Sequence, residues 1–181
     1  ILVKRCHDRC VVPPGRIRNG QGNPYKVFTA FKKNWLQTVL PLPITPYGKP
    51  RKQKAMSDSS ATAADIDSLF APHDLRDLSE QWPAGEKAAR KRLDLFVEKS
   101  IARYQEDRDF PAIDGTSMLS PYLALGALSP RQAITSVLAR YHGEWDANQG
   151  VQTWINELIW REFYYHVVVD FPDVCKHQPM Q

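Results

Sequence analysis

The fold of this 181-residue chain is indicated most clearly by residues 151–169, which read VQTWINELIWREFYYHVVV. Apolar residues recur there at helical spacing, and Phe171-Pro172 closes the segment. At about 100° per residue, one face collects the side chains of an ordinary core contact. These are Val151, Ile155, Leu158, Ile159, His166 and Val169. The segment therefore predicts a long helix with one buried side.

The opposite face of this helix is rich in aromatic residues. Trp154, Glu157, Trp160, Arg161 and Tyr164 occupy an arc of roughly 120°. Aromatic rings offer stacking area, while Glu157 accepts and Arg161 donates hydrogen bonds, so this face suits a flat ligand with polar edges. The spacing of Glu157 and Arg161 also favours a mutual ion pair. Packing of the aromatic residues against another helix is the alternative interpretation.

Further helices are expected at 28–40, 86–104, 122–128 and from Ser129 to about residue 141. Thr29 is a candidate cap for the first, and Ser120, followed by proline, is a candidate cap for the third. Ser129 and Gln132 have the spacing of a capping box, and Gly143 ends that helix. No alternating strand pattern follows residue 86, so the second half is predicted to be all-α.

The first part of the chain has a different character. Residues 1–3, Ile-Leu-Val, are typical of the interior of a β-strand, so we expect an excerpt from a longer protein. Four prolines between residues 41 and 50 and a Ser/Ala/Asp-rich run at 57–67 indicate a long linker. The predicted fold is an α/β segment at 1–40, a linker at 41–85 and an all-α segment at 86–181.

Charge and cysteine content narrow the class of protein. Residues 1–55 carry 12 Lys/Arg and one acid, whereas residues 56–181 carry 12 Lys/Arg and 19 acids. The basic part is a candidate footprint for a polyanion, with simple solvation of a linker by Lys49, Arg51, Lys52 and Lys54 as the alternative. Three cysteines exclude a disulfide scaffold and suit a reducing compartment.

Hydroxyl residues gather in the loop before the third helix. Thr116, Ser117 and Ser120 lie within five positions, next to a helix start whose free N–H groups attract anions. This loop is a candidate phosphate site, and plain helix capping is the alternative.

Three strings carry a resemblance to a known family. Residues 104–133 read YQEDRDFPAIDGTSMLSPYLALGALSPRQA, residues 154–172 read WINELIWREFYYHVVVDFP, and residues 25–36, after VVPPG, read YKVFTAFKKNWL. In their order along the chain, these strings resemble the DNA photolyase/cryptochrome family, and most of all its bacterial class I cyclobutane pyrimidine dimer photolyases. The resemblance implies that residues 1–40 are the end of a Rossmann-like antenna domain. It also implies that residues 86–181 are the first helices of an all-α FAD-binding domain.

The resemblance assigns roles to individual residues. Contacts to FAD are implied for Tyr104, Thr116, Ser117, Met118, Leu119, Ser120, Trp154, Glu157 and Arg161. Contacts to DNA are implied for Arg108, Glu157, Trp160, Arg161 and Tyr164. Glu157 matches a glutamate that hydrogen-bonds the flipped dimer and Trp160 a tryptophan that stacks on it, so these two are the expected catalytic residues. Some relatives have a basic residue in place of Met118, so only its backbone is expected at a phosphate.

The activity implied by the resemblance is light-driven DNA repair. Reduced FAD, excited directly or through a folate- or deazaflavin-type antenna chromophore, donates an electron to the dimer; the cyclobutane ring opens and the electron returns. The implied partner is UV-damaged DNA with its dimer flipped out of the stack. We expect a cytoplasmic, nucleoid-associated bacterial monomer without membrane contact. Further flavin contacts of the family lie beyond residue 181, so we expect this chain alone to bind FAD weakly or not at all.

Two other functions are compatible with parts of the sequence. A cryptochrome would share the fold and FAD but signal without repair, although plant-type cryptochromes lose the tryptophan that Trp160 matches. A metal site could combine Cys6, His7, Cys10, Cys175 and His177. The second pair is only Cys-x-His and lies across the linker, so no metal is expected.

Overall fold

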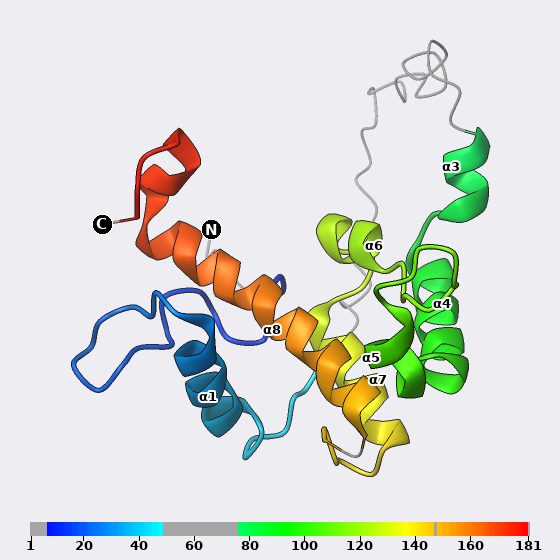
Figure 1. The fold of residues 1–181 in the computed structure, drawn as a ribbon, viewed down its shortest axis with the longest axis horizontal. Coiled ribbons are helices and arrows are strands. Elements are labelled where there is room, and N and C mark those ends of the chain that lie inside the picture. Colours follow the sequence, from blue (N-terminus) through cyan, green and yellow to red (C-terminus); the bar gives the residue numbers. More distant parts are fainter. Residues whose placement is uncertain (1–6, 49–75, 147, 181) are drawn as a thin grey trace, which may run out of the picture.

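The computed structural model describes residues 7–48, 76–146 and 148–180, and within these ranges it contains helices and loops but no β-strand (Figure 1). The α-helices are α1 (Phe28–Val39), α3 (Arg76–Gln81), α4 (Glu86–Lys99), α5 (Tyr104–Asp107), α6 (Ser120–Leu125), α7 (Pro130–Arg140) and α8 (Gln149–Asp170). Two 3-10 helices are η1 (Ile101–Arg103) and η2 (Pro172–Lys176). The prediction that the second half is helical is confirmed. The expected strand at 1–3 and the basic run at 49–54 lie outside the described residues.

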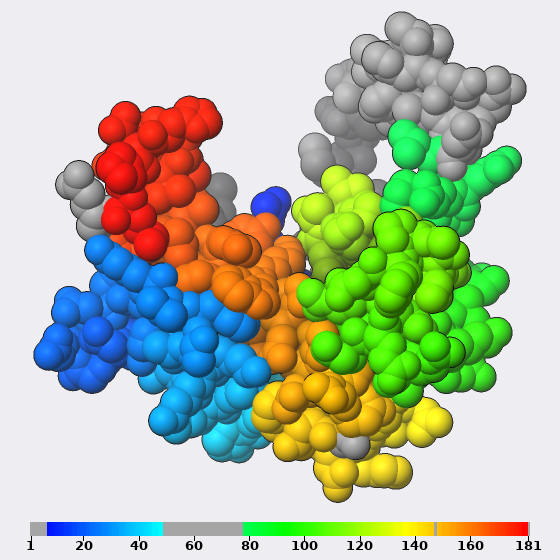
Figure 2. All heavy atoms as spheres, viewed as in Figure 1, coloured from blue at the N-terminus to red at the C-terminus, as the bar shows by residue number. Residues whose placement is uncertain are grey.

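Helix α8 forms the centre of the molecule (Figure 1). Its N-terminal half packs against η1, α5 and α7, and its C-terminal half packs against α1. Figure 2 shows the blue and cyan N-terminal segment on one side of the orange helix and the green helices on the other. Because neighbours lie on both sides, more than one face of α8 is buried.

The predicted core face of α8 is largely correct. Val151, Ile155, Leu158, Ile159 and His166 are buried. Val169 was predicted to be buried but is 55% exposed, because it lies in the last turn of α8. Burial extends to two side chains outside this face, Trp154 and Phe163, and the face itself includes a buried acid, Glu162. A single apolar face therefore describes only part of this helix.

Helix ends follow the predicted capping in one case out of three. Ser129 accepts from the amide of Gln132, and the Gln132 side chain accepts in return from the amide of Ser129, so the capping box that opens α7 is confirmed. Thr29 is not a cap, because α1 begins one residue earlier, after Val27, without a side-chain cap. Ser120 is the first residue of α6 rather than its cap, and Leu119 occupies the cap position.

The predicted helix at 86–104 is divided into three pieces. Helix α4 ends at Lys99, η1 follows, and α5 begins at Tyr104. Gly150 of α8 crosses η1 so closely that a Cβ atom there would lie 2.2 Å from the carbonyl oxygen of Ile101 and 2.4 Å from that of Ala102. The change of direction after Lys99 therefore occurs where the chain meets α8, a contact that helical periodicity does not reveal.

Helix α1 supplies the aromatic contact to the other half of α8. Phe31, Trp35 and Val39 are buried, as their spacing predicts, and Phe28 is half-buried. Phe31 packs against Phe163 at a ring distance of 5.2 Å and against His166 at 4.9 Å. This packing joins the first 40 residues to the C-terminal half of α8.

Candidate functional site

A shallow, open depression of about 480 Å³, which we call the groove, lies on the exposed side of α8. Its walls are side chains of α8 alone: Glu157, Trp160, Arg161, Tyr164, Tyr165 and Val168. Four of the five residues predicted on the aromatic face of this helix line the groove, and Trp154 does not. The groove therefore combines an acid, a guanidinium and three aromatic rings, which can hydrogen-bond and stack against a flat ligand.

Trp160 packs against two neighbouring rings. Phe28 of α1 lies parallel to the indole, with ring centroids 3.5 Å apart and an angle of 8° between the planes. The Tyr164 ring lies farther away, with its centroid 5.6 Å from that of Trp160 and an angle of 25° between the planes. One face of the indole is thus covered by α1. For that face, the alternative interpretation, in which the aromatic residues pack against another helix, is correct. Trp160 still lines the groove.

Glu157 pairs with a distant arginine rather than with its helical neighbour. The Arg108 guanidinium donates a hydrogen bond to the Glu157 carboxylate, and this contact raises the pKa of Arg108. The predicted pair with Arg161 is not formed. Arg108 also lies over the Tyr104 ring, at 5.7 Å from its centroid. Burial, and then the Glu157 charge, raises the pKa of the Tyr104 hydroxyl.

Arg161 connects α8 to two other parts of the chain through hydrogen bonds. Its guanidinium donates to the backbone carbonyl of Arg9 and, at 3.2 Å, to that of Leu123. It also lies over the Tyr165 ring, at 4.9 Å from the centroid. These bonds explain why Arg161 is not available to Glu157: two carbonyl oxygens compete for the same donors.

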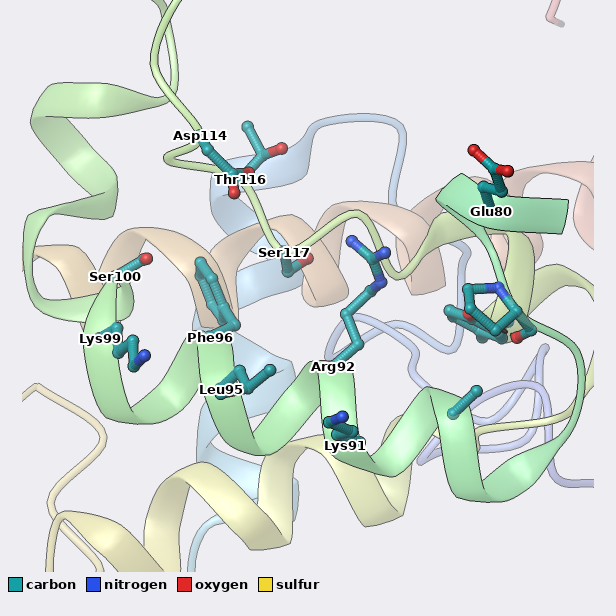
Figure 3. Close-up of a pocket in the computed structure, with 13 residues that line it drawn as sticks. Glu80, Lys91, Arg92, Leu95, Phe96, Lys99, Ser100, Asp114, Thr116 and Ser117 are labelled. Atoms are coloured by element: carbon teal, nitrogen blue, oxygen red, sulfur yellow. Dashed lines mark hydrogen bonds between the residues drawn. The ribbon is translucent and has the colours of Figure 1, made fainter. Parts of the chain in front are cut away.

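A second concavity lies between α4 and the loop before α6 (Figure 3). This pocket of about 580 Å³ is lined by Thr116 and Ser117 of the predicted phosphate loop. Three cationic side chains of α4, Lys91, Arg92 and Lys99, line the same space, and so do two carboxylates, Glu80 and Asp114. Hydroxyl donors facing cationic side chains suit a phosphate-bearing ligand.

The remaining residues of the predicted phosphate loop have backbone rather than side-chain roles. Met118 has a φ of 51°, in the left-handed region, and its carbonyl accepts from the Trp82 indole at 3.0 Å. Leu119 is 1% exposed, and Ser120 is exposed at the start of α6. Just before the loop, a Cβ atom on Gly115 would lie 2.4 Å from the Asp107 Cβ, so the loop is seated tightly on α5.

Trp154 lies in the interior and lines neither concavity. It is 3% exposed and packs against Phe96, at a ring distance of 5.5 Å. Tyr104 meets the same ring edge-on at 5.8 Å. Phe96 in turn lines the pocket with Thr116 and Ser117. The predicted flavin-site residues are thus connected through Phe96, but among the described residues the groove and the pocket share no lining residue.

Several residues of these sites were not predicted from the sequence. Phe96, Arg92 and Lys99 line the pocket, and Phe28 supports Trp160. The apolar spacing of residues 86–104 includes Phe96 but gives it no functional role, and the sequence assigned no role to the basic residues of α4. Their role depends on which loop lies opposite α4, and local spacing carries no signal for that.

The two cysteines within the described residues, Cys10 and Cys175, are free thiols, and Cys6 lies outside those residues. Cys10 is buried and Cys175 is exposed. Burial raises the pKa of Cys10 to about 12, with the nearby Glu162 charge as a smaller cause, so its thiol stays protonated and is a poor metal ligand. Within the described residues no cluster of three His, Cys, Asp or Glu side chains could hold a metal ion.

The fold and the two concavities define a helical protein segment with an aromatic, acid-bearing groove beside a pocket suited to phosphates. Residues 1–56 match the family model described as DNA photolyase. The chain is 39% identical over 182 residues to the deoxyribodipyrimidine photo-lyase of Escherichia coli, covering 99% of this chain and 37% of that protein. It is 40% identical to the enzyme of the same name from Vibrio cholerae, with 97% and 37% covered.

A solved structure agrees with these matches. The crystal structure of a bacterial class III photolyase from Agrobacterium tumefaciens superposes with a TM-score of 0.69 at 29% identity, covering 92% of this chain and 34% of that one. The resemblance to the DNA photolyase family is therefore confirmed. The chain spans a little over a third of the length of these curated relatives. Among the described residues, no helix is both long and apolar enough to cross a membrane.

Proposed function

We propose that the whole protein is a light-dependent DNA-repair lyase, which uses reduced FAD to split cyclobutane pyrimidine dimers in UV-damaged DNA. The observation that carries this proposal is the groove on α8, where Glu157, Trp160 and Tyr164 offer one acceptor and two stacking surfaces. An extruded pair of bases requires both kinds of contact. The names of the curated relatives support the same function.

In this proposal the groove residues bind and orient the lesion. Trp160, held from behind by Phe28, stacks on the flipped bases, and the Glu157 carboxyl group hydrogen-bonds their polar edge. Arg108 holds Glu157 in place and, with Arg161, adds positive charge for the DNA backbone. Tyr164 extends the stacking surface at the exposed rim of the groove.

The described residues fit the phosphate end of FAD better than its ring. Thr116, Ser117 and the backbone of the loop through Ser120 would hold the diphosphate, facing the cations of α4. Tyr104 and Trp154 would lie near the ring system, yet both pack against Phe96 and do not line the pocket. When bound, FAD would supply the electron that opens the cyclobutane ring. We therefore expect this chain alone to show weak flavin absorbance or none.

The same proposal covers the domain organisation and the remaining partners. Residues 1–40 would be the end of a Rossmann-like antenna domain, 41–85 a linker that includes α3, and 86–181 the start of the FAD-binding domain. The whole protein would carry an antenna chromophore of folate or deazaflavin type. It would act as a cytoplasmic monomer that reaches the nucleoid through DNA.

A light-and-dark comparison tests the function. Reduced, FAD-loaded whole protein should split the thymine dimers of an oligonucleotide into thymines under blue light and leave the dimers intact in the dark. Equal dimer content in the two samples would refute the repair function and leave the cryptochrome alternative.

A substitution tests the groove. Trp160→Ala should weaken binding of dimer-containing DNA by about 1–3 kcal/mol, because a stacking surface is lost. Trp145→Ala is the matched control, since that half-buried indole lines a different groove with Leu138 and Lys32 lies over its ring. Unchanged lesion affinity in Trp160→Ala would show that the groove is not the lesion site.

A further inference from the structure

Residues 9–18, which we name the N-terminal strap, are bound along α8 by a column of polar side chains. The acceptors lie one helical turn apart and are Glu162, His166 and Asp170. The amides of Val11 and Val12 donate to Glu162, and the amide of Gly15 donates to His166 Nδ1 at 3.2 Å. The Arg18 guanidinium donates to both oxygens of Asp170, at 2.6 Å each. The strap is therefore fixed to three successive turns of α8.

Glu162 is the member of this column that joins three elements. It is 1% exposed, and besides the two strap amides it accepts from the Trp35 indole of α1 at 2.7 Å. All three partners are N–H donors, and the carboxylate form of Glu162, which only accepts, matches all of them. A glutamine of the same size would turn its own NH₂ toward at least one of these donors and leave a buried polar group without a partner.

The two segments that Glu162 binds also brace the groove. Trp160 stacks on Phe28, which belongs to α1, the helix that Trp35 ties to Glu162. Arg161 donates to the carbonyl of Arg9, two residues before the strap amide of Val11. Glu162 itself follows these two groove residues directly in α8. Movement of the strap or of α1 would therefore change the support of both side chains.

We propose that Glu162 is a positioning residue for the lesion-binding groove: by fastening the strap and α1 to α8, it holds Trp160 and Arg161 in the orientations that bind the flipped dimer. This inference rests on the function proposed above. Glu162 does not line the groove and acts through its neighbours.

The charged and titratable groups around Glu162 come from each packed element. The strap brings Cys10 and Arg9 near it, α7 brings Arg131, and α8 itself brings Arg161 and His166. Arg131 donates to the carbonyl of Val11, so it supports the strap from the other side. None of these groups is a carboxylate. Only the arginines carry a full charge at neutral pH, because burial lowers the pKa of His166 and raises that of Cys10.

Glu162→Gln in the whole protein tests the proposal without light. Dark affinity for a dimer-containing oligonucleotide should fall about tenfold, while affinity for undamaged DNA should fall less, because only the Arg161 contact to the backbone is common to both. The ¹⁵N-indole signal of Trp160, assigned by its loss in Trp160→Phe, should shift or broaden. Hydrogen exchange of the strap amides should become about tenfold faster.

Asp170→Asn is the matched control, since it weakens the same column two turns away and contacts no groove residue. It should lower the stability of the protein but leave the Trp160 signal and the lesion affinity unchanged. The proposal is overturned if Glu162→Gln preserves both, or if Asp170→Asn alters them equally.

Trp35→Phe provides the test if Glu162→Gln does not fold. It removes one donor to Glu162 and should shift the same Trp160 signal, with a two- to threefold loss of lesion affinity. An unchanged Trp160 signal in this variant overturns the proposal. If the wild-type protein does not distinguish damaged from undamaged DNA, the proposed function fails, and the indole and exchange measurements still decide the role of Glu162.

Discussion

Replacing Gly150 with alanine should destabilise the chain, because the new Cβ atom would collide with the backbone of η1. An added Cβ atom would lie 2.2 Å from the carbonyl oxygen of Ile101, 2.4 Å from that of Ala102 and 2.7 Å from the carbonyl carbon of Ala102. All three neighbours are backbone atoms, so no side chain can rotate away. Overpacking of this kind costs about 3 kcal/mol at its upper range. Alanine recovers at most about 1 kcal/mol of helix propensity. The net loss is therefore about 2 kcal/mol.

Urea or thermal unfolding followed by circular dichroism measures this effect. A loss of about 2 kcal/mol corresponds to a fall in Tm of about 4–8 °C for a chain of this size. Gly20→Ala is the control, because nothing lies within 4 Å of a Cβ atom at that exposed turn position. If Gly150→Ala unfolds at the same temperature as Gly20→Ala, the close crossing of α8 over η1 is not a determinant of stability.

The remaining predictions concern pH, thiols and capping. Burial raises the pKa of Glu162 from 4.5 to about 7, against the opposing hydrogen bonds from Val11 and Trp35. As the pH rises, Glu162 therefore ionises in the unfolded state before it does in the folded state, and the free energy of unfolding should fall by about 3 kcal/mol between pH 4.5 and 7. In urea titrations at several pH values, Glu162→Gln should not show this fall. Parallel pH profiles of the wild-type protein and the variant would contradict the prediction. Exposed Cys175 should react with iodoacetamide in the native protein, whereas Cys10 should react only on unfolding, as peptide mass spectrometry would reveal. Ser129→Ala should cost about 1 kcal/mol in urea unfolding because the capping box of α7 is lost; Ser136→Ala on the same helix should cost clearly less.

Periodicity predicted the existence of the main helices because each apolar stripe is a local property. The ends of α8 and the capping box at Ser129 followed from nearby residues for the same reason. The family resemblance identified groove residues such as Glu157 and Trp160, and the structure brings these two to one groove. Their roles with FAD and DNA stay predictions.

What the sequence did not predict depends on partners far along the chain. Glu157 meets Arg108 across 49 residues, a partner that competes successfully with Arg161 one turn away. By helical spacing Glu162 falls on the core face of α8. Spacing does not show what satisfies a buried acid there, because one of its donors, the amide of Val11 in the strap, lies 151 residues away. Trp154 was assigned to the exposed aromatic face for a similar reason: a helix wheel does not show that α8 has neighbours on both sides.

The union of α1 with α8 has a consequence for synthesis on the ribosome. The apolar side of α1, with Phe31 and Trp35, packs against α8, which starts about 110 residues after α1 ends. At roughly 5–20 residues per second, these rings stay without their native cover for roughly 5–20 s. Nascent chains paused between the two helices should therefore be the ones that molecular chaperones hold most strongly.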